Sequence, residues 1–513
     1  MNVGIIENRT KNAKKGLVSG FIYQVLGLLL PFVSRTIIIY VLGIEYIGLN
    51  TLYSSILNVL NITELGFGSA ISFILYKPIS EDDKEKVCAI LKFAKTCFRI
   101  IGIVVLVLGI CVTPFLDYII SSDRPSEINI YVLYFLNLIY TVTSYLLFSY
   151  KRILFSANQR YDLETNISSI TLIAQYILQI IVLAVWKNFY LFTAMAIVSS
   201  VANNILCQIV TKKKYPLFIP KGKLEKNDLF ILKKTVIGAF CSRIGSVIYS
   251  SVDNIIISSM FGLVILGKFN NYYMIIQSLL ALFAVIHNSL RPILGNCIIT
   301  ETKDFNIRKL KEVNCLYLWL VLFCACCMIC LYQEFITIWV GNAYTFDFIF
   351  VVLLVTYFLV GRINAIPGLF VEAAGFWWEK RWVYLISAGA NLVLNFILGN
   401  FLGINGIIIA SIMSSFFISY IGDIILLEKY YFKSRVIVLN FLLDTFKTVF
   451  LGSIILILMY LVSHLFSCSS IWLFCAKGLL ILFVFISFFI IVSIFDKGTR
   501  HIRNYLFSLI RRK

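Results

Sequence analysis

The sequence predicts an all-α integral membrane protein with about 14 transmembrane helices, arranged as two like-oriented six-helix bundles followed by a C-terminal helix pair. Three observations predict this fold class. The 513 residues are 60% hydrophobic and 14% charged, whereas soluble domains are about 25% charged. Fourteen stretches are long and apolar enough for the roughly 20-residue helix that crosses a bilayer. Positive charge gathers in alternate connections between these stretches.

The apolar stretches follow one another along the whole chain. The first seven cover approximately residues 17–41, 48–76, 88–113, 129–150, 166–186, 189–210 and 235–257. The next seven cover approximately residues 269–290, 314–333, 348–371, 382–402, 404–427, 440–463 and 471–495. These runs are continuously apolar and lack the alternation of barrel strands, so they predict helices.

The charges of the connections predict the orientation of the chain. With the amino terminus inside, the inner segments hold 37 of the 45 Lys and Arg, and the outer loops hold only Arg124, Lys187 and Lys268. Lys and Arg concentrate on the cytoplasmic side of membrane proteins. We therefore expect both termini to be cytoplasmic and the basic tail, residues 500–513, to lie against anionic headgroups. This topology accounts for the net charge of +19 without a nucleic-acid partner.

A short motif occurs twice and predicts an internal repeat. Residues 41–48 (VLGIEYIG) resemble residues 260–267 (MFGLVILG) at an offset of 219, and residues 154–161 align with residues 371–378 at an offset of 217. An even number of spans separates the copies, so the two halves share one orientation and are related by an axis along the membrane normal.

The repeat divides the chain into four predicted parts. These are an N-terminal six-helix bundle (1–211), a basic cytoplasmic linker (212–234), a C-terminal six-helix bundle (235–430) and an extra helix pair with a basic tail (431–513). Two like-oriented bundles can enclose a cavity that opens alternately to either side, which is typical of a transporter. The sequence has no GxxxxGK[ST] phosphate loop. Because no connection has room for a catalytic domain, we expect neither an enzyme nor a cofactor.

Arginines within the apolar stretches are the first candidate binding residues. Arg243 and Arg362 are expected near mid-membrane, Arg35 in the outer third of the first helix, and Arg291 with His287 at the inner end of the eighth. Guanidinium groups bind phosphate oxygens through paired hydrogen bonds. The four arginines therefore indicate an anionic, phosphate-bearing cargo. The alternative is that each neutralises a neighbouring acid or reaches a headgroup.

Acidic residues and a proline are candidates for gating or ion coupling. The acids at depth are Glu64, Asp253 and Asp423. The repeat places Asp253 at nearly the height of Arg35, and one hypothesis is that the two pair when the cavity is closed to the outside; the alternative is unrelated local partners. Pro31 should bend the first helix one turn before Arg35. The bend serves either as a gate or as a static kink.

Two lysines and the cysteines are expected to have structural roles. Lys447 and Lys477 lie in the unrepeated helices, where we expect them to extend to water or to reach Asp444. Cysteines such as Cys327 and Cys330 are expected to be small packing residues. A zinc site needs four ligands, and this apolar stretch offers no histidine, so we expect no metal site here.

Several short motifs resemble one superfamily. They are the GLVSG run at 16–20, Leu42 and Gly43 followed by Gly48, and the ELGFG run at 64–68, combined with two six-helix halves and a final pair. This pattern resembles the multidrug, oligosaccharidyl-lipid and polysaccharide (MOP) exporter superfamily, and within it the bacterial O-antigen and capsule repeat-unit flippases. The resemblance covers essentially the whole chain, although each motif is short.

The resemblance implies a function. Such flippases move undecaprenyl-diphosphate-linked oligosaccharides across the bacterial cytoplasmic membrane for capsule, O-antigen or exopolysaccharide assembly, alongside other polysaccharide assembly proteins. It implies a diphosphate near Arg243 and Arg362, sugars in a wet cavity and a lipid tail in the bilayer. It also implies coupling to an ion gradient or to membrane potential. Glu64 and Asp253 are the candidates for coupling to Na⁺ or H⁺.

Two other functions are weighed against this one. A cation-coupled multidrug exporter of the same superfamily usually has twelve helices and an acidic cavity, so the helix count and the arginines argue against it. A membrane polysaccharide polymerase or glycosyltransferase would ordinarily have a long outer loop with acidic or histidine chemistry, which this sequence lacks.

Overall fold

Helices make up the regular secondary structure in the part of the chain that the computed structural model describes. The described residues are 2–503 without 62–70, 73, 76–77, 80, 121–123, 126, 148, 159, 225, 465–470, 497–498 and 501–502. Their side chains are described except at 2–14, 17, 226–250, 292, 377, 462, 464 and 471.

The long apolar helices of the structure agree with the predicted fold class. Eleven described helices are long and apolar enough to cross a membrane, or twelve if the bent pair Ile130–Leu146 and Ser149–Ala157 is one span. Two further expected spans, 48–76 and 235–257, include residues or side chains outside the described set. The prediction of an all-α, multi-pass membrane protein is confirmed.

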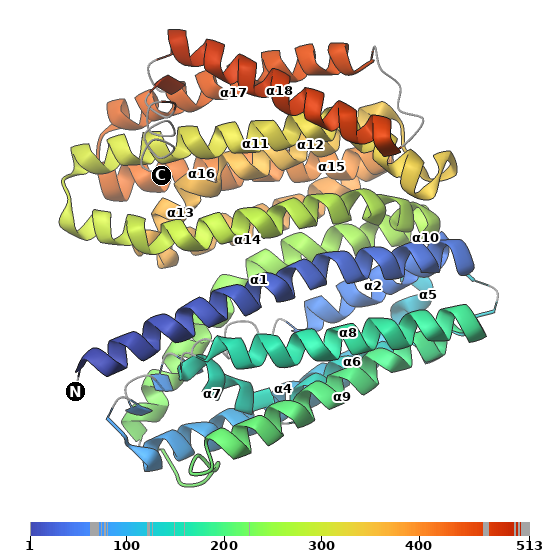
Figure 1. Cartoon of the computed structure of the whole chain (residues 1–513), viewed down its shortest axis with the longest axis vertical. Helices are drawn as coiled ribbons and strands as arrows, with labels where there is room; N and C mark the ends of the chain where they lie inside the picture. The colour runs from blue at the N-terminus through green and yellow to red at the C-terminus, as the bar shows by residue number, and fades with distance from the viewer. Residues whose placement is uncertain are drawn as a thin grey trace. The chain divides into compact units, whose positions relative to one another are not determined.

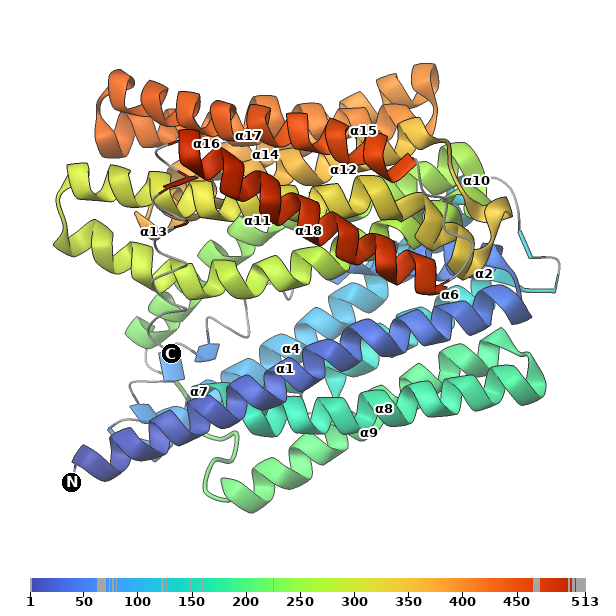
Figure 2. The same cartoon turned by 45° about the horizontal axis from the view of Figure 1, so that its top comes forward.

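The chain divides into two compact units, Met1–Gly267 and Lys268–Lys513 (Figure 1). In the first unit, α1 packs along α8, and α8 lies beside α9 in both views (Figures 1 and 2). The helices of this unit are α1 (Asn2–Val41), α2 (Ile44–Leu60), α4 (Lys84–Val112), α5 (Leu116–Ile119), α6 (Ile130–Leu146), α7 (Arg152–Ala157), α8 (Tyr161–Trp186), α9 (Phe189–Lys214) and the first part of α10 (Lys226–Thr300). Two short 3₁₀ turns, η2 (Thr113–Phe115) and η3 (Ser149–Lys151), lie between them.

The second unit contains the remainder of α10 and the helices that follow it. These are α11 (Lys303–Val340), α12 (Phe348–Ile363), α13 (Ala365–Ala373), α14 (Trp377–Leu402), α15 (Ile404–Met413), α16 (Ile421–Leu426), α17 (Arg435–His464) and α18 (Ile471–Phe495). Two π-helical segments, Ser414–Tyr420 and Leu427–Phe432, flank α16. Asp423 therefore lies on a short α-helical stretch between two wider turns.

Polar side chains fix where several helices begin. The first backbone N–H groups of a helix have no partner within it, and a preceding Asp, Asn or Thr oxygen can accept from them. Such caps precede α4, α6, α9 and α11. The capping residues are Asp83, Asn129, Asn188 and Thr302.

The repeated motif ends a helix in the same way in both copies. Gly43 separates α1 from α2 at φ 120°, and Gly262 breaks α10 at φ 84°. Backbone of positive φ is accessible to glycine because it has no Cβ. A second pair of turns also corresponds: Lys187 follows α8 at φ 48°, and Gly403 follows α14 at φ 62°, after helices of 26 residues each.

The last glycines of the two motifs pack the copies together within the first unit. A Cβ added to Gly48 would lie 2.1 Å from the carbonyl oxygen of Leu263, and a Cβ added to Gly267 would lie 2.6 Å from that of Ile44. Leu263 is the repeat equivalent of Ile44, so the two contacts are reciprocal. The start of α2 and the segment of α10 after Gly262 touch backbone to backbone.

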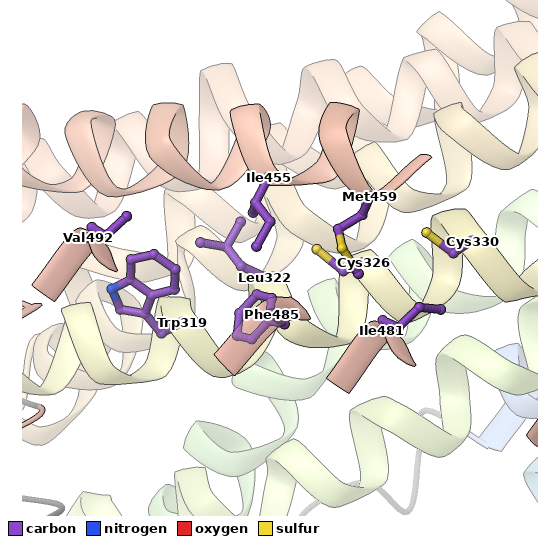
Figure 3. Packing of buried hydrophobic residues seen from close by; sticks show 9 residues of the cluster. All are labelled: Trp319, Leu322, Cys326, Cys330, Ile455, Met459, Ile481, Phe485 and Val492. Atoms are coloured by element: carbon purple, nitrogen blue, oxygen red, sulfur yellow. The ribbon is translucent and has the colours of Figure 1, made fainter. Parts of the chain in front are cut away.

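The C-terminal helices α17 and α18 pack on α11 through an apolar cluster (Figure 3). Its buried members are Trp319, Leu322, Cys326, Cys330, Ile455, Met459, Ile481, Phe485 and Val492. Cys326 and Cys330 are free thiols inside this cluster. These two cysteines therefore fill space between the helices.

Candidate functional site

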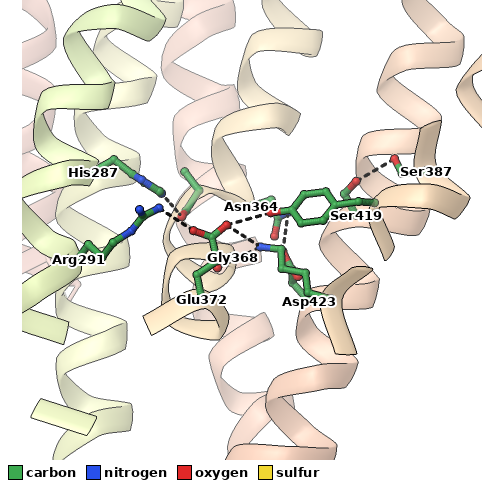
Figure 4. Close-up of polar contacts among 11 residues, drawn as sticks. His287, Arg291, Asn364, Gly368, Glu372, Ser387, Ser419 and Asp423 are labelled. Carbon is green, nitrogen blue, oxygen red and sulfur yellow. Dashed lines mark hydrogen bonds and ion pairs between the residues drawn. The ribbon is translucent and has the colours of Figure 1, made fainter. Parts of the chain in front are cut away.

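A network of four charged side chains lies inside the second unit (Figure 4). The Lys380 ammonium lies 3.1 Å from Asp423 Oδ2 and 3.3 Å from Glu372 Oε1. The other oxygen of Glu372 accepts a hydrogen bond of 2.7 Å from Arg291. One carboxylate thus joins a buried lysine to an arginine whose side chain is 46% exposed.

The helix break at Asn364 and the small residue Gly368 bring these groups together. The helix break at Asn364 separates α12 from α13, and the Asn364 amide donates to Asp423 Oδ2 at 3.0 Å. The Gly368 carbonyl accepts from the Lys380 ammonium at 3.1 Å. A Cβ on Gly368 would lie 2.9 Å from Asp423 Oδ2 and 3.0 Å from Lys380 Nζ. Glycine at this position therefore makes room for the ion pair.

Burial makes the balance of charge important. The side chains of Lys380 and Asp423 are 4% and 0% exposed. An ion at membrane depth costs a few kcal/mol or more unless it is paired. Two cations and two carboxylates leave the network neutral, and Tyr384 donates a further hydrogen bond of 2.9 Å to Glu372 Oε1.

A second polar group lies on the adjoining faces of α11 and α12. The charge of Arg362 is close enough to act on the Tyr317 hydroxyl. Arg362 Nε and the Tyr317 oxygen are both buried, and among the described residues neither makes a well-aligned hydrogen bond; Arg362 is nevertheless close enough to Tyr317 for a weak side-chain hydrogen bond between the two. Buried polar groups normally have partners. The two side chains therefore form a buried polar pair whose hydrogen-bonding capacity is not fully used.

The predicted site residues have different surroundings in the structure. Arg291 pairs with Glu372, which matches the alternative that an arginine neutralises a neighbouring acid. His287, one turn earlier, lies with Nε2 3.1 Å from the carbonyl oxygen of Ala365 (Figure 4). Arg362 is on α12 and is not part of the four-charge network.

The remaining candidates fall in or near the first unit. Arg35 is half-buried on α1, where Tyr176 of α8 acts on its charge. Helix α1 continues through Pro31 as one helix. Asp253 is half-buried on α10. The side chain of Arg243, whose backbone belongs to α10, lies outside the described residues, as does Glu64.

Glu372 and Lys380 were not among the predicted site residues. The expected spans ended at 371 and began again at 382, so both charges were assigned to a connection. The sequence signal that could have found them is the Pro367–Gly368 interruption. A helix that is broken at membrane depth needs polar partners for its backbone.

The two lysines of the C-terminal pair are ion-paired. Lys477 is buried and lies 2.7 Å from Glu334, so the expectation that it extends to water was wrong. Lys447 pairs with Asp496 at 2.5 Å rather than with Asp444. Burial alone would raise the pKa of the Asp496 carboxyl, but hydrogen bonds from Lys447 and Thr499 hold that pKa below its usual range.

Several solved structures have a similar fold. Lipid II flippase MurJ in an inward closed conformation has a TM-score of 0.63 at 15% identity, over 92% of this chain and 98% of that one. An inward-facing multidrug resistance MATE transporter of the MOP superfamily has a TM-score of 0.61 at 13% identity, over 81% and 99%. A variant of the Vibrio cholerae MATE transporter VcmN has a TM-score of 0.56 at 14% identity, over 82% and 98%. The protein has the fold of the MOP superfamily.

Sequence comparison gives the family. The model of the family described as "Polysaccharide biosynthesis protein" matches residues 13–297, which is more than half of the chain. The chain belongs to this family. No curated protein sequence matches it significantly.

Proposed function

We propose that the protein is a flippase that moves undecaprenyl-diphosphate-linked oligosaccharide repeat units across the bacterial cytoplasmic membrane for capsule, O-antigen or exopolysaccharide assembly. The observation that carries the proposal is membership of the polysaccharide biosynthesis family in a chain with the fold of a lipid II flippase. The protein performs no covalent chemistry in this proposal. Both termini lie in the cytoplasm, as the basic inner connections favour.

The proposed diphosphate ligands are Arg243 and Arg362, assisted by Arg35 and Arg291. The unpartnered Nε of Arg362, together with the Tyr317 hydroxyl, supports this role. A phosphate oxygen would satisfy both donors at once, and a charge-assisted hydrogen bond is about twice as strong as a neutral one. Arg291 would exchange Glu372 for phosphate when cargo arrives.

Translocation proceeds in this proposal by rocking of the two predicted bundles, 1–211 and 235–430, around a central cavity. Asp253 and Glu64 couple the movement to Na⁺ or H⁺, and Arg35 with Asp253 forms the outer gate. Bending at Pro31 accompanies opening. These roles are proposals for residues whose positions, except that of Glu64, are described above.

A cation-coupled drug exporter is the second candidate, and the fold likeness to the MATE transporter supports it. Two observations favour the flippase. The family match concerns polysaccharide biosynthesis. The four-charge network is neutral, and the buried Nε donor of Arg362 suits an anion better than a cation.

Alanine substitution of Arg243 or Arg362 should block export of the saccharide. Loss of a hydrogen-bonded charge removes about 1.5–3 kcal/mol of binding, or roughly tenfold to a hundredfold in affinity. Cells that carry Arg362→Ala or Arg243→Ala in place of the native gene should accumulate unflipped lipid-linked saccharide on the inner leaflet. Arg362→Lys should retain partial activity. Accumulation is measured by extraction and chromatography of the lipid-linked pool.

The matched control is Arg308→Ala, because Arg308 is an exposed arginine on α11. It should leave export unchanged. Normal export in both Arg243→Ala and Arg362→Ala would remove the phosphate-binding role. Unchanged saccharide export with loss of resistance to cationic drugs would instead establish the exporter.

A further inference from the structure

A buried lysine without a counter-charge lies at one end of the first unit. Lys151 ends the short turn η3, which packs between α4 and α9, and the residue is 8% exposed. It forms neither an ion pair nor a side-chain hydrogen bond with any residue that the structure describes. Because no carboxylate balances its charge among the described residues, this position favours a negatively charged ligand.

Three more cations lie near this lysine or near its neighbour Tyr150. Lys95 of α4 and Lys212 of α9 are close enough for their charges to act on Lys151. Arg99 follows Lys95 by about one turn of α4 and acts on Tyr150, the neighbour of Lys151. None of the four has a carboxylate within ion-pair distance among the described residues. Four mutually repelling charges with no acid between them are stabilised when an anion binds.

The cationic cluster of Lys95, Arg99, Lys151 and Lys212 lies at the edge of an apolar surface. After Arg99, the rest of α4 has no charged residue, and the next one along the chain is Asp117 of α5. Its outward side chains there are large and apolar: Ile100, Ile103, Val107 and Ile110 are 49–56% exposed. On α9, Leu206 and Ile209 are also exposed shortly before Lys212. A charged head beside the cluster would therefore continue into an apolar tail along α4 and α9.

We propose that the cationic cluster is a binding site for an anionic glycerophospholipid. The phosphate contacts Lys151 and is neutralised by Lys95, Arg99 and Lys212, while the acyl chains lie on the exposed faces of α4 and α9. Basic pockets between transmembrane helices bind such headgroups. The adjoining apolar surface selects a lipid over free phosphate. The site is separate from the residues proposed to bind cargo, so it is independent of the proposed function.

Lipid binding to the purified full-length protein tests this site. Detergent-solubilised protein is titrated with phosphatidylglycerol or phosphatidylcholine, and bound lipid is counted by native mass spectrometry. The wild type should prefer phosphatidylglycerol. Lys151→Gln should weaken phosphatidylglycerol binding about tenfold, equivalent to about 1.4 kcal/mol, and Lys151→Arg should restore most of it. Lys187→Gln, at an exposed lysine following α8, is the matched control and should bind like the wild type.

Two results would overturn the proposal. One is equal phosphatidylglycerol binding by Lys151→Gln and the wild type. The other is displacement of the lipid by millimolar inorganic phosphate, which would make this a free-anion site. If Lys151→Gln does not fold, lipid binding is measured instead with Lys95→Gln combined with Lys212→Gln. Both lysines are partly or fully exposed, so their replacement should not prevent folding. Undiminished lipid binding in that double variant would equally contradict the assignment.

Discussion

Replacing Lys380 with methionine should destabilise the protein by about 3–5 kcal/mol, the range for removing one partner of a buried ion pair. The methionine fills much of the same volume, so the cost arises from charge. Asp423 is fully buried and would lose its cation, and among the described residues Glu372 would keep Arg291 and Tyr384 as partners. The measurement is unfolding of the purified protein by titration with SDS in mixed micelles.

A second variant separates lost charge from lost packing. Lys380→Met combined with Asp423→Asn restores neutrality, and it should recover most of the lost stability. Lys309→Met is the surface control. Lys309 Nζ lies 3.6 Å from Glu312 Oε2, and the two side chains are 41% and 56% exposed. Breaking this exposed pair should change stability by less than about 1 kcal/mol. If Lys380→Met were as stable as Lys309→Met, the network would not hold the second unit together.

Replacing Gly48 with alanine should destabilise the first unit by about 3 kcal/mol, at the upper end of the usual cost of overpacking. The added Cβ would lie 2.1 Å from the Leu263 oxygen and 2.9 Å from its carbonyl carbon. These are backbone atoms, so no side chain can rotate away. The start of α2 must move from α10, and the same titration measures the loss.

Gly295→Ala is the matched control for that substitution. Gly295 is also helical, but a Cβ there would meet nothing within 4 Å. Alanine has a helix propensity up to about 1 kcal/mol better than glycine, so this variant should be neutral or more stable. A Gly48→Ala protein that behaves like Gly295→Ala would show that the two copies of the motif do not need their backbone contact.

Most of the fold could be predicted because the bilayer imposes it. The requirement for a long apolar run acts on each helix separately, so α8 or α18 can be recognised without knowing its neighbours. Gly43 and Gly262 were also recognisable from sequence as a repeated pair. Their positive φ values and the reciprocal packing of Gly48 and Gly267 are properties of three-dimensional structure that the repeat only suggested.

The candidate site was predicted only in part, because pairing depends on which helices meet. Arg291 and Asp423 were recognised as charges at depth. Their partners Glu372 and Lys380 were assigned to a connection, since charge usually ends an apolar run. Sequence distance gives no indication that Arg291 meets a glutamate 81 residues away. Arg362 shows the converse: it has no ion pair with an acid among the described residues, and nothing in its local sequence distinguishes it from an arginine that has one.

The two π-helical segments around α16 bear on how the Asp423 carboxylate can be oriented. A π turn holds one more residue than an α turn. Such a turn can move along a helix by exchanging one backbone hydrogen bond after another, so that the helix stays continuous. Passage of one wide turn across residues 421–426 would swivel the Asp423 carboxylate by about 100° around the axis. Helix α16 could thus alternate between two registers, one with the aspartate against the lysine and one with it facing elsewhere, at the cost of a few hydrogen bonds at a time.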